Sequence, residues 1–157
     1  MLVTQFFRAL NLFGAALLSG GLTWVLLVTI PAFRRMSQVE SFRAHQTQLD
    51  DLPDRYMPAA WFAAVGGALV VALAGRDPSR PSELFYLLGV LALVPMVLIT
   101  LFQNVPTNRL IRRLSVEAVP AEYPAIRRTW NRRHLIRTLC ALAALLCFIL
   151  ANVVIAA

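Results

Sequence analysis

Four long apolar blocks, separated by polar segments, dominate the pattern of the chain. They cover residues 9–33, 58–75, 84–102 and 139–157, and the first contains no charged side chain. A helix crosses the hydrocarbon core of a bilayer with about 20 predominantly apolar residues, so each block can span it. The pattern predicts an all-α fold, an integral membrane four-helix bundle that forms a single transmembrane domain over residues 1–157.

The expected helices extend a little beyond the apolar blocks. We predict them over about 5–33, 58–75, 84–103 and 130–156, because an amphipathic stretch from Trp130 leads into the last block. Long polar connections join helix 1 to helix 2 and helix 3 to helix 4. Pro95 should remove one backbone hydrogen bond and kink the third helix.

Small residues recur four positions apart in the first two helices. Such spacing lets helix backbones approach closely in lipid, so it predicts the faces on which these helices pack. The residues are Ala16, Gly20, Ala59, Ala63 and Gly67.

Composition supports a membrane protein over a soluble one. Hydrophobic residues make up 59% of the chain and charged residues 15%, whereas soluble domains are about 45–50% apolar and about 25% charged. The net charge of +7 comes from arginine, because the chain contains no lysine. No nucleic-acid-binding motif accompanies this charge. We therefore expect contact with membrane lipid and no nucleic-acid partner.

The distribution of arginine predicts the orientation. Eleven arginines lie in the two long connections, whereas Arg8, Arg76 and Arg80 lie on the other side. The positive-inside rule then places both long connections in the cytoplasm and both termini outside, in a membrane that we predict to be the bacterial inner membrane.

Polar side chains gather at the predicted cytoplasmic end of the bundle. Trp130, His134 and Arg137 have the spacing of one helical face. Arg137 lies just inside the apolar block, where an ionised group usually faces the bundle interior, although a long side chain can also snorkel outward. The segment between the first two helices adds further polar residues, namely His45, Asp50, Asp51, Asp54, Arg55 and Tyr56.

Asn104 and Asn108 flank Pro106 at the end of the third block. Proline restricts the preceding residue, so Val105 should be extended and the segment should form a turn. Asparagine side chains readily cap turns, and these two residues could therefore have a structural role alone.

Metal and cofactor chemistry finds little support in the pattern. No His-x-x-x-His or Cys-x-x-Cys occurs, and we predict no metal and no cofactor, although a haem shared by His45 and His134 stays open. His134 is the better candidate for proton transfer. His45 lies in a polar connection without an evident partner. Cys140 and Cys147 are spaced too far apart on one helix to form a disulfide.

The chain resembles the anthrone oxygenase family in two motifs. These are Asn104-Val-Pro106-Thr-Asn108, which closes the third helix, and Trp130-x-x-x-His134-x-x-Arg137, which opens the fourth. Pro120 and Pro124 lie in the polar segment between them. The first helix is also similar, with Gly14, Ser19 and Gly20 leading to Pro31-Ala-Phe, so the resemblance covers nearly the whole chain.

The resemblance implies an oxygenase that converts an anthrone to an anthraquinone with dioxygen and no recognised cofactor motif. In that case His134 would be the base that removes a proton from the substrate. Arg137, Asn104 and Asn108 would stabilise the developing oxyanion. Trp130 and Tyr56 would contact the flat aromatic substrate.

A second hypothesis is a non-enzymatic membrane protein, which is a binding protein, an assembly partner or a structural subunit. A homo-oligomer stays open under both hypotheses. Its polar residues would simply join the third and fourth helices. The enzyme hypothesis requires a cavity bordered by Trp130, His134 and Arg137 and open to lipid or cytoplasm. The structural hypothesis allows these side chains to be packed solidly.

Overall fold

A computed structural model describes residues 2–48, 53–75, 81–115 and 119–156. Asp50, Asp51, Arg76 and Arg80 lie outside these ranges. The elements in chain order are α1 (Leu2–Trp24), η1 (Val25–Thr29), α2 (Ile30–Arg34), α3 (Gln38–Gln48), α4 (Pro53–Gly75), α5 (Pro81–Ile99), η2 (Thr100–Asn104), α6 (Val105–Arg113) and α7 (Tyr123–Ala156). The two η elements are π-helical turns.

The predicted all-α membrane fold is confirmed. The described residues contain helices and no strand, and four stretches are long and apolar enough to cross a membrane. These stretches are Leu2–Arg34, Tyr56–Ala74, Pro81–Arg113 and Tyr123–Val153. Large apolar side chains such as Phe13, Phe62 and Leu146 point outward, as a lipid-facing surface requires.

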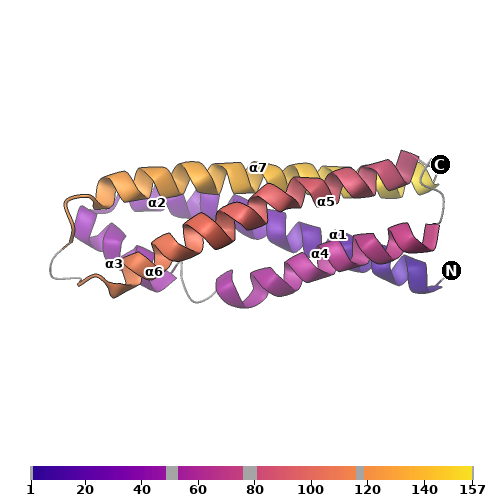
Figure 1. The fold of residues 1–157 in the computed structure, drawn as a ribbon. Helices are drawn as coiled ribbons and strands as arrows, with labels where there is room; N and C mark the ends of the chain where they lie inside the picture. Colours follow the sequence, from indigo (N-terminus) through magenta and orange to yellow (C-terminus); the bar gives the residue numbers. More distant parts are fainter. Residues whose placement is uncertain (1, 49–52, 76–80, 116–118, 157) are drawn as a thin grey trace.

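Both chain termini lie at one end of the bundle, and α3 and α6 lie at the other (Figure 1). We call the latter the α3–α6 end. Two membrane crossings separate the two long connections, so both connections lie on the same side of the membrane. Which side is cytoplasmic stays a prediction from the arginine distribution.

The bundle consists of two helical hairpins. In the first, α1 packs along α4, and in the second, α5 packs along α7. The contact between α1 and α7 joins the hairpins, whereas α4 and α5 share only a small interface. Figure 1 shows that α4 begins short of the α3–α6 end, whereas the α5–α6 stretch continues to it.

Glycine allows the close approach of α1 and α4. A Cβ added to Gly14 would lie 2.5 Å from the backbone oxygen of Ala60 and 2.6 Å from the backbone nitrogen of Ala64. A Cβ added to Gly67 would lie 2.7 Å from the backbone oxygen of Phe7 on α1. The predicted Ala16–Gly20 face was wrong, because both residues are exposed and nothing lies within 4 Å of a Cβ on Gly20.

The first and third membrane stretches each contain a π-helical turn just before a proline. The backbone N–H of Ile30 bonds to the carbonyl of Val25, and that of Val105 bonds to the carbonyl of Thr100. Each bond reaches one residue further back than in an α-helix. Pro31 and Pro106 follow directly.

The predicted turn at residues 104–108 was therefore wrong. Val105 is α-helical, with φ −58° and ψ −48°, and the third stretch continues to Arg113 instead of ending near residue 103. Proline disturbs a regular helix because it lacks an N–H and its ring meets the carbonyl four residues back. A π-helical turn widens that part of the helix, so the chain can remain helical through Pro106.

The connection between α2 and α4 contains a helix, α3, that begins with a capping box. The backbone N–H of Glu40 donates to Oγ of Ser37 at 3.3 Å, and the backbone N–H of Ser37 donates to Oε2 of Glu40 at 2.9 Å. Hydrogen bonding from the side chain and then the backbone of Ser37 holds the pKa of the exposed Glu40 carboxyl below its usual value. The fourth helix also begins earlier than predicted, at Tyr123.

Candidate functional site

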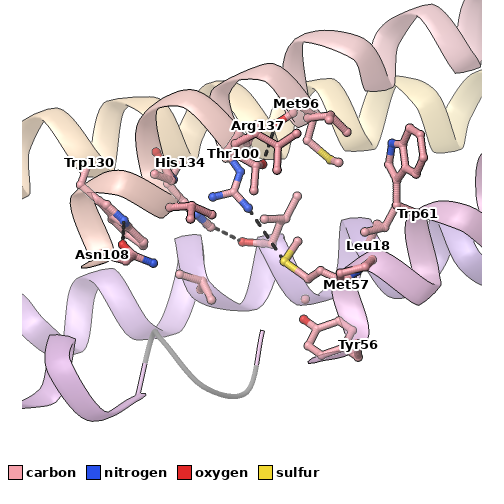
Figure 2. A pocket seen from close by; sticks show the side chains of 18 of the residues that line it. Leu18, Tyr56, Met57, Trp61, Met96, Thr100, Asn108, Trp130, His134 and Arg137 are labelled. Atoms are coloured by element: carbon pink, nitrogen blue, oxygen red, sulfur yellow. Dashed lines mark hydrogen bonds between the residues drawn. The ribbon is translucent and has the colours of Figure 1, made fainter. Parts of the chain in front are cut away.

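A cavity of about 510 Å³ lies between the two hairpins, toward the α3–α6 end. Its lining includes the exposed side chains of Phe62 on α4 and Leu101 on η2, so the cavity reaches the surface of the bundle at these residues. All six residues predicted from the sequence as a site line this one cavity. They are Asn104 and the five residues labelled in Figure 2, namely Tyr56, Asn108, Trp130, His134 and Arg137.

Most of the cavity wall is apolar. The first hairpin contributes side chains such as Leu18, Met57 and Trp61, and the second contributes Met96 and Val97. Ligand sites of this kind combine an apolar lining with a few polar groups, and they commonly measure about 300–1,000 Å³. The cavity therefore suits a hydrophobic small molecule that carries a few polar atoms.

His134 is anchored to the opposite hairpin by a hydrogen bond. Its Nε2 lies 3.0 Å from the carbonyl oxygen of Leu22 on α1, and the residue is 2% exposed. A carbonyl can only accept, so Nε2 carries the proton and Nδ1 of the neutral ring is the unprotonated nitrogen. Nδ1 is buried and has no hydrogen-bond partner among the described residues. The ring is thus fixed in position with one basic nitrogen still available.

Trp130 is held on several sides. Its ring is stacked on that of His134, with 5.1 Å between the centroids and 6° between the planes. Its Nε1 donates to Oδ1 of Asn108 at 3.0 Å, a bond that links α7 to α6 (Figure 2). Because His134 covers one face of the indole, only the remaining surface of Trp130 can border a ligand.

Asn104 is a buried polar side chain at the cavity wall. It lies on η2, is 2% exposed, and neither Oδ1 nor Nδ2 has a hydrogen-bond partner among the described residues. It makes no capping hydrogen bond to α6, which is the structural role that its sequence position suggested. A buried amide without partners is unfavourable by about 1–3 kcal/mol, so this group is suited to bonding with a ligand or a water in the cavity.

Arg137 faces the interior instead of snorkelling outward. It is 6% exposed, and its Nη2 donates to Sδ of Met57 across the cavity at 3.9 Å. Tyr56 lies at the cavity edge and is 40% exposed. A Cβ on Gly21 would collide with its hydroxyl group, so the glycine leaves room for this ring.

Several parts of the site were missed from the sequence. Met57 and Trp61 had no distinguishing signal within an apolar helix. The carbonyl of Leu22 is a backbone group, which no residue pattern reports. His45 was considered a weak candidate in a polar connection, but it lies on α3, is 2% exposed, and packs edge-on against Trp130.

The two histidines both contact Trp130, His45 in an edge-to-face arrangement and His134 stacked on the indole. Among the described residues, no group of three or more His, Cys, Asp or Glu side chains is arranged to hold a metal ion. Cys140 and Cys147 are free thiols, as their spacing predicted.

Comparison with known protein families gives one match. The model of a family described as anthrone oxygenase matches residues 51–147, which is more than half of the chain and includes all six predicted site residues. The match does not extend to the first helix, where a similarity had also been expected. No curated protein and no solved structure shows a significant match.

Proposed function

Because this chain belongs to the anthrone oxygenase family, we propose that it is a membrane oxygenase that uses dioxygen, without a cofactor, to oxidise a flat hydrophobic aromatic substrate of the anthrone type. The observation that carries this proposal is the cavity itself. It brings a histidine with an unbonded Nδ1, an unpartnered amide and an arginine to the wall of an apolar chamber. An opening beside lipid suits a substrate that partitions into the membrane.

The overall reaction converts a ring methylene and one dioxygen into a ring carbonyl and one water. Removal of one methylene proton gives a carbanion, whose charge is delocalised onto the carbonyl oxygen across the ring. The carbanion adds to dioxygen, which forms a C–O bond and reduces the dioxygen to a peroxide. Loss of the second proton from the same carbon then breaks the O–O bond, forms the new carbonyl and releases hydroxide, which leaves as water.

His134 would take the first proton at Nδ1. The Leu22 carbonyl keeps the proton of the neutral ring on Nε2, so Nδ1 is the lone pair that can act as the base. The same bond to Leu22 stabilises the imidazolium that forms, because a protonated Nε2–H remains a donor to the carbonyl. The peroxide would then receive that proton back from Nδ1.

Asn104 and Arg137 would stabilise the charge on the oxygen atoms. The Nδ2 of Asn104 is a donor without a partner among the described residues, and Arg137 places a guanidinium at the cavity wall. Donors that are already oriented in a site of low dielectric stabilise a developing oxyanion more strongly than water does. Asn108 would act mainly by holding Trp130 in place.

The test is oxygen uptake by the protein in nanodiscs with an emodin-type anthrone, and it compares wild type with His134→Ala and His134→Gln. Glutamine can still donate an N–H to the Leu22 carbonyl but cannot act as a base. General-base catalysis contributes about 10²–10⁴-fold, so both variants should lose at least about 100-fold in rate. A control without protein measures the spontaneous oxidation of the anthrone.

Two results would contradict the proposal. Uptake by folded wild-type protein that is no faster than the control would remove an anthrone as the substrate. Full activity in His134→Gln would instead show that His134 is not the base, and the proposed oxygenase activity would still hold.

A non-enzymatic role is the second candidate, because polar bonds do join the third and fourth membrane stretches. Trp130 bonds to Asn108 at 3.0 Å, and Nη1 of Arg133 donates to Oγ1 of Thr107 at 3.4 Å. Under this hypothesis the protein binds a hydrophobic aromatic molecule without converting it. Saturable binding of an anthraquinone, combined with no oxygen uptake above the control, would favour it.

A further inference from the structure

His45 lies directly behind the cavity wall. It is not among the residues that line the cavity, but its ring centroid is 5.2 Å from that of Trp130, with 68° between the planes. Trp130 in turn stacks on His134. The three rings are thus in consecutive contact, from His45 on α3 through Trp130 to His134, the proposed base.

The helix that carries His45 is firmly attached to the rest of the bundle. Nε2 of Gln46 donates to the carbonyl oxygens of Ile111 and Leu114, at 2.9 and 2.8 Å. On the other side, the hydroxyl of Tyr123 donates to the carbonyl of Ser41 at 3.0 Å. These bonds fix α3 against α6 and α7, so the position of the His45 ring is set by tertiary structure.

Trp130 is enclosed by groups that meet different parts of its indole. His134 covers a face, His45 meets the ring edge-on, and Asn108 bonds to Nε1. Phe33 and Ala44 belong to the same buried cluster. An indole restrained in this way cannot rotate, and the stacked His134 ring is restrained with it.

From this arrangement we infer that His45 is a positioning residue: it holds Trp130 against His134 and thereby orients the proposed base toward the substrate. This inference rests on the proposed function. Removal of the His45 ring leaves space beside the indole, so Trp130 and His134 gain freedom of movement. A displacement of about 1 Å at a reacting group can lower a rate by about 100-fold, so even partial disorder would slow proton removal.

The test uses Trp130 as its own reporter. The chain contains three tryptophans, so a parent protein with Trp24→Phe and Trp61→Phe retains Trp130 alone. In this parent, His45→Leu should lower the fluorescence anisotropy and the near-ultraviolet circular dichroism of Trp130. It should also lower kcat for the anthrone about tenfold while KM changes by no more than about twofold.

Two further variants separate positioning from general stability. His45→Phe keeps an aromatic edge against the indole and should restore most of the Trp130 signal and of kcat. Gln46→Ala, on the neighbouring residue, removes two of the bonds that attach α3, whereas the Tyr123–Ser41 bond and the His45 ring itself remain. It should lower thermal stability without the same loss in the Trp130 signal or in kcat.

The inference is overturned if His45→Leu leaves the Trp130 signal unchanged, or if Gln46→Ala reproduces all of its effects. If wild type shows no turnover, the proposed function fails. The Trp130 signal and the affinity for an anthraquinone would then still decide whether His45 orders this side of the cavity.

Discussion

The first hairpin, α1 to α4, and the second, α5 to α7, each place a π-helical turn before a proline. The corresponding residues lie 75 positions apart: Gly14 and Gly89 at the helix contacts, Val25 and Thr100 at the start of the turns, and Pro31 and Pro106 after them. The chain therefore repeats one backbone plan, in which two helices are closely packed toward the chain termini and the first of them widens toward the α3–α6 end.

The two hairpins differ in what they present to the cavity. At matched positions, the first contributes Gly21 and Val25 and the second contributes Met96 and Thr100. The polar side chains that line the wall come mainly from the second hairpin, whereas the first supplies the Leu22 carbonyl that anchors His134. The shared π-helical turn therefore makes room for the cavity, whereas the side chains beside the turn determine whether polar groups line it.

The largest effect on the stability of the bundle is expected from a substitution at Gly14. Its added Cβ meets backbone atoms of α4, which cannot move aside, so Gly14→Ala should destabilise the bundle by about 3 kcal/mol. Gly20→Ala on the same helix is the matched control and should cause no loss, because nothing lies within 4 Å. Unfolding in detergent micelles measures both. Equal stability of the two variants would contradict the close packing of α1 on α4.

The second hairpin should tolerate the equivalent change better. A Cβ on Gly89 meets the ring of Phe148, a side chain that can be replaced, so Gly89→Ala should cost about 1–2 kcal/mol. Adding Phe148→Leu should recover part of this loss, so that the double variant is more stable than the sum of the single changes predicts. Strict additivity in a double-mutant cycle would show that the glycine does not act through this ring.

A smaller and opposite effect on stability is expected at Asn104. Asn104→Leu removes an amide that has no hydrogen-bond partner in the described part of the chain, so stability should stay unchanged or rise by about 1 kcal/mol. Affinity for an anthraquinone should fall by about tenfold, because the ligand loses a hydrogen bond. Thr29→Leu changes the matched position of the first π-helical turn, which does not line the cavity, and should leave affinity unchanged. Thermal unfolding and ligand titration together test this pair.

The sequence predicted the membrane helices well, and it placed three candidate residues on one helical face, for separate physical reasons. Apolar length decides whether a helix can cross lipid, and that length is visible in the residues themselves. Trp130, His134 and Arg137 share a helical face by spacing alone, and the structure places all three at one cavity. Their catalytic and binding roles stay a prediction.

Features set by tertiary contacts could not be predicted. Pro106 favoured an end of the helix, but the widened turn at Thr100–Asn104 allows the helix to continue. The face of α1 that packs on α4 was misassigned, because spacing shows that small residues recur without showing which partner they meet. His45 was assigned only to a polar connection, because its burial depends on Trp130, which lies far away in the sequence.

The smallest expected effect concerns α3, the helix in the connection of the first hairpin. The Ser37 hydrogen bonds lower the pKa of Glu40, so their stabilisation is present at neutral pH and is lost as the pH falls through that lowered value. Amide exchange in α3 should therefore accelerate at acidic pH relative to exchange in α6, after correction for the intrinsic rate. Glu40→Gln keeps a side chain that can complete the capping box but cannot titrate, so its α3 should lose this dependence. If the variant retains the dependence, another group controls the fraying of α3. If the dependence disappears, the capping box stabilises the start of α3. This helix carries the ring of His45 behind the cavity.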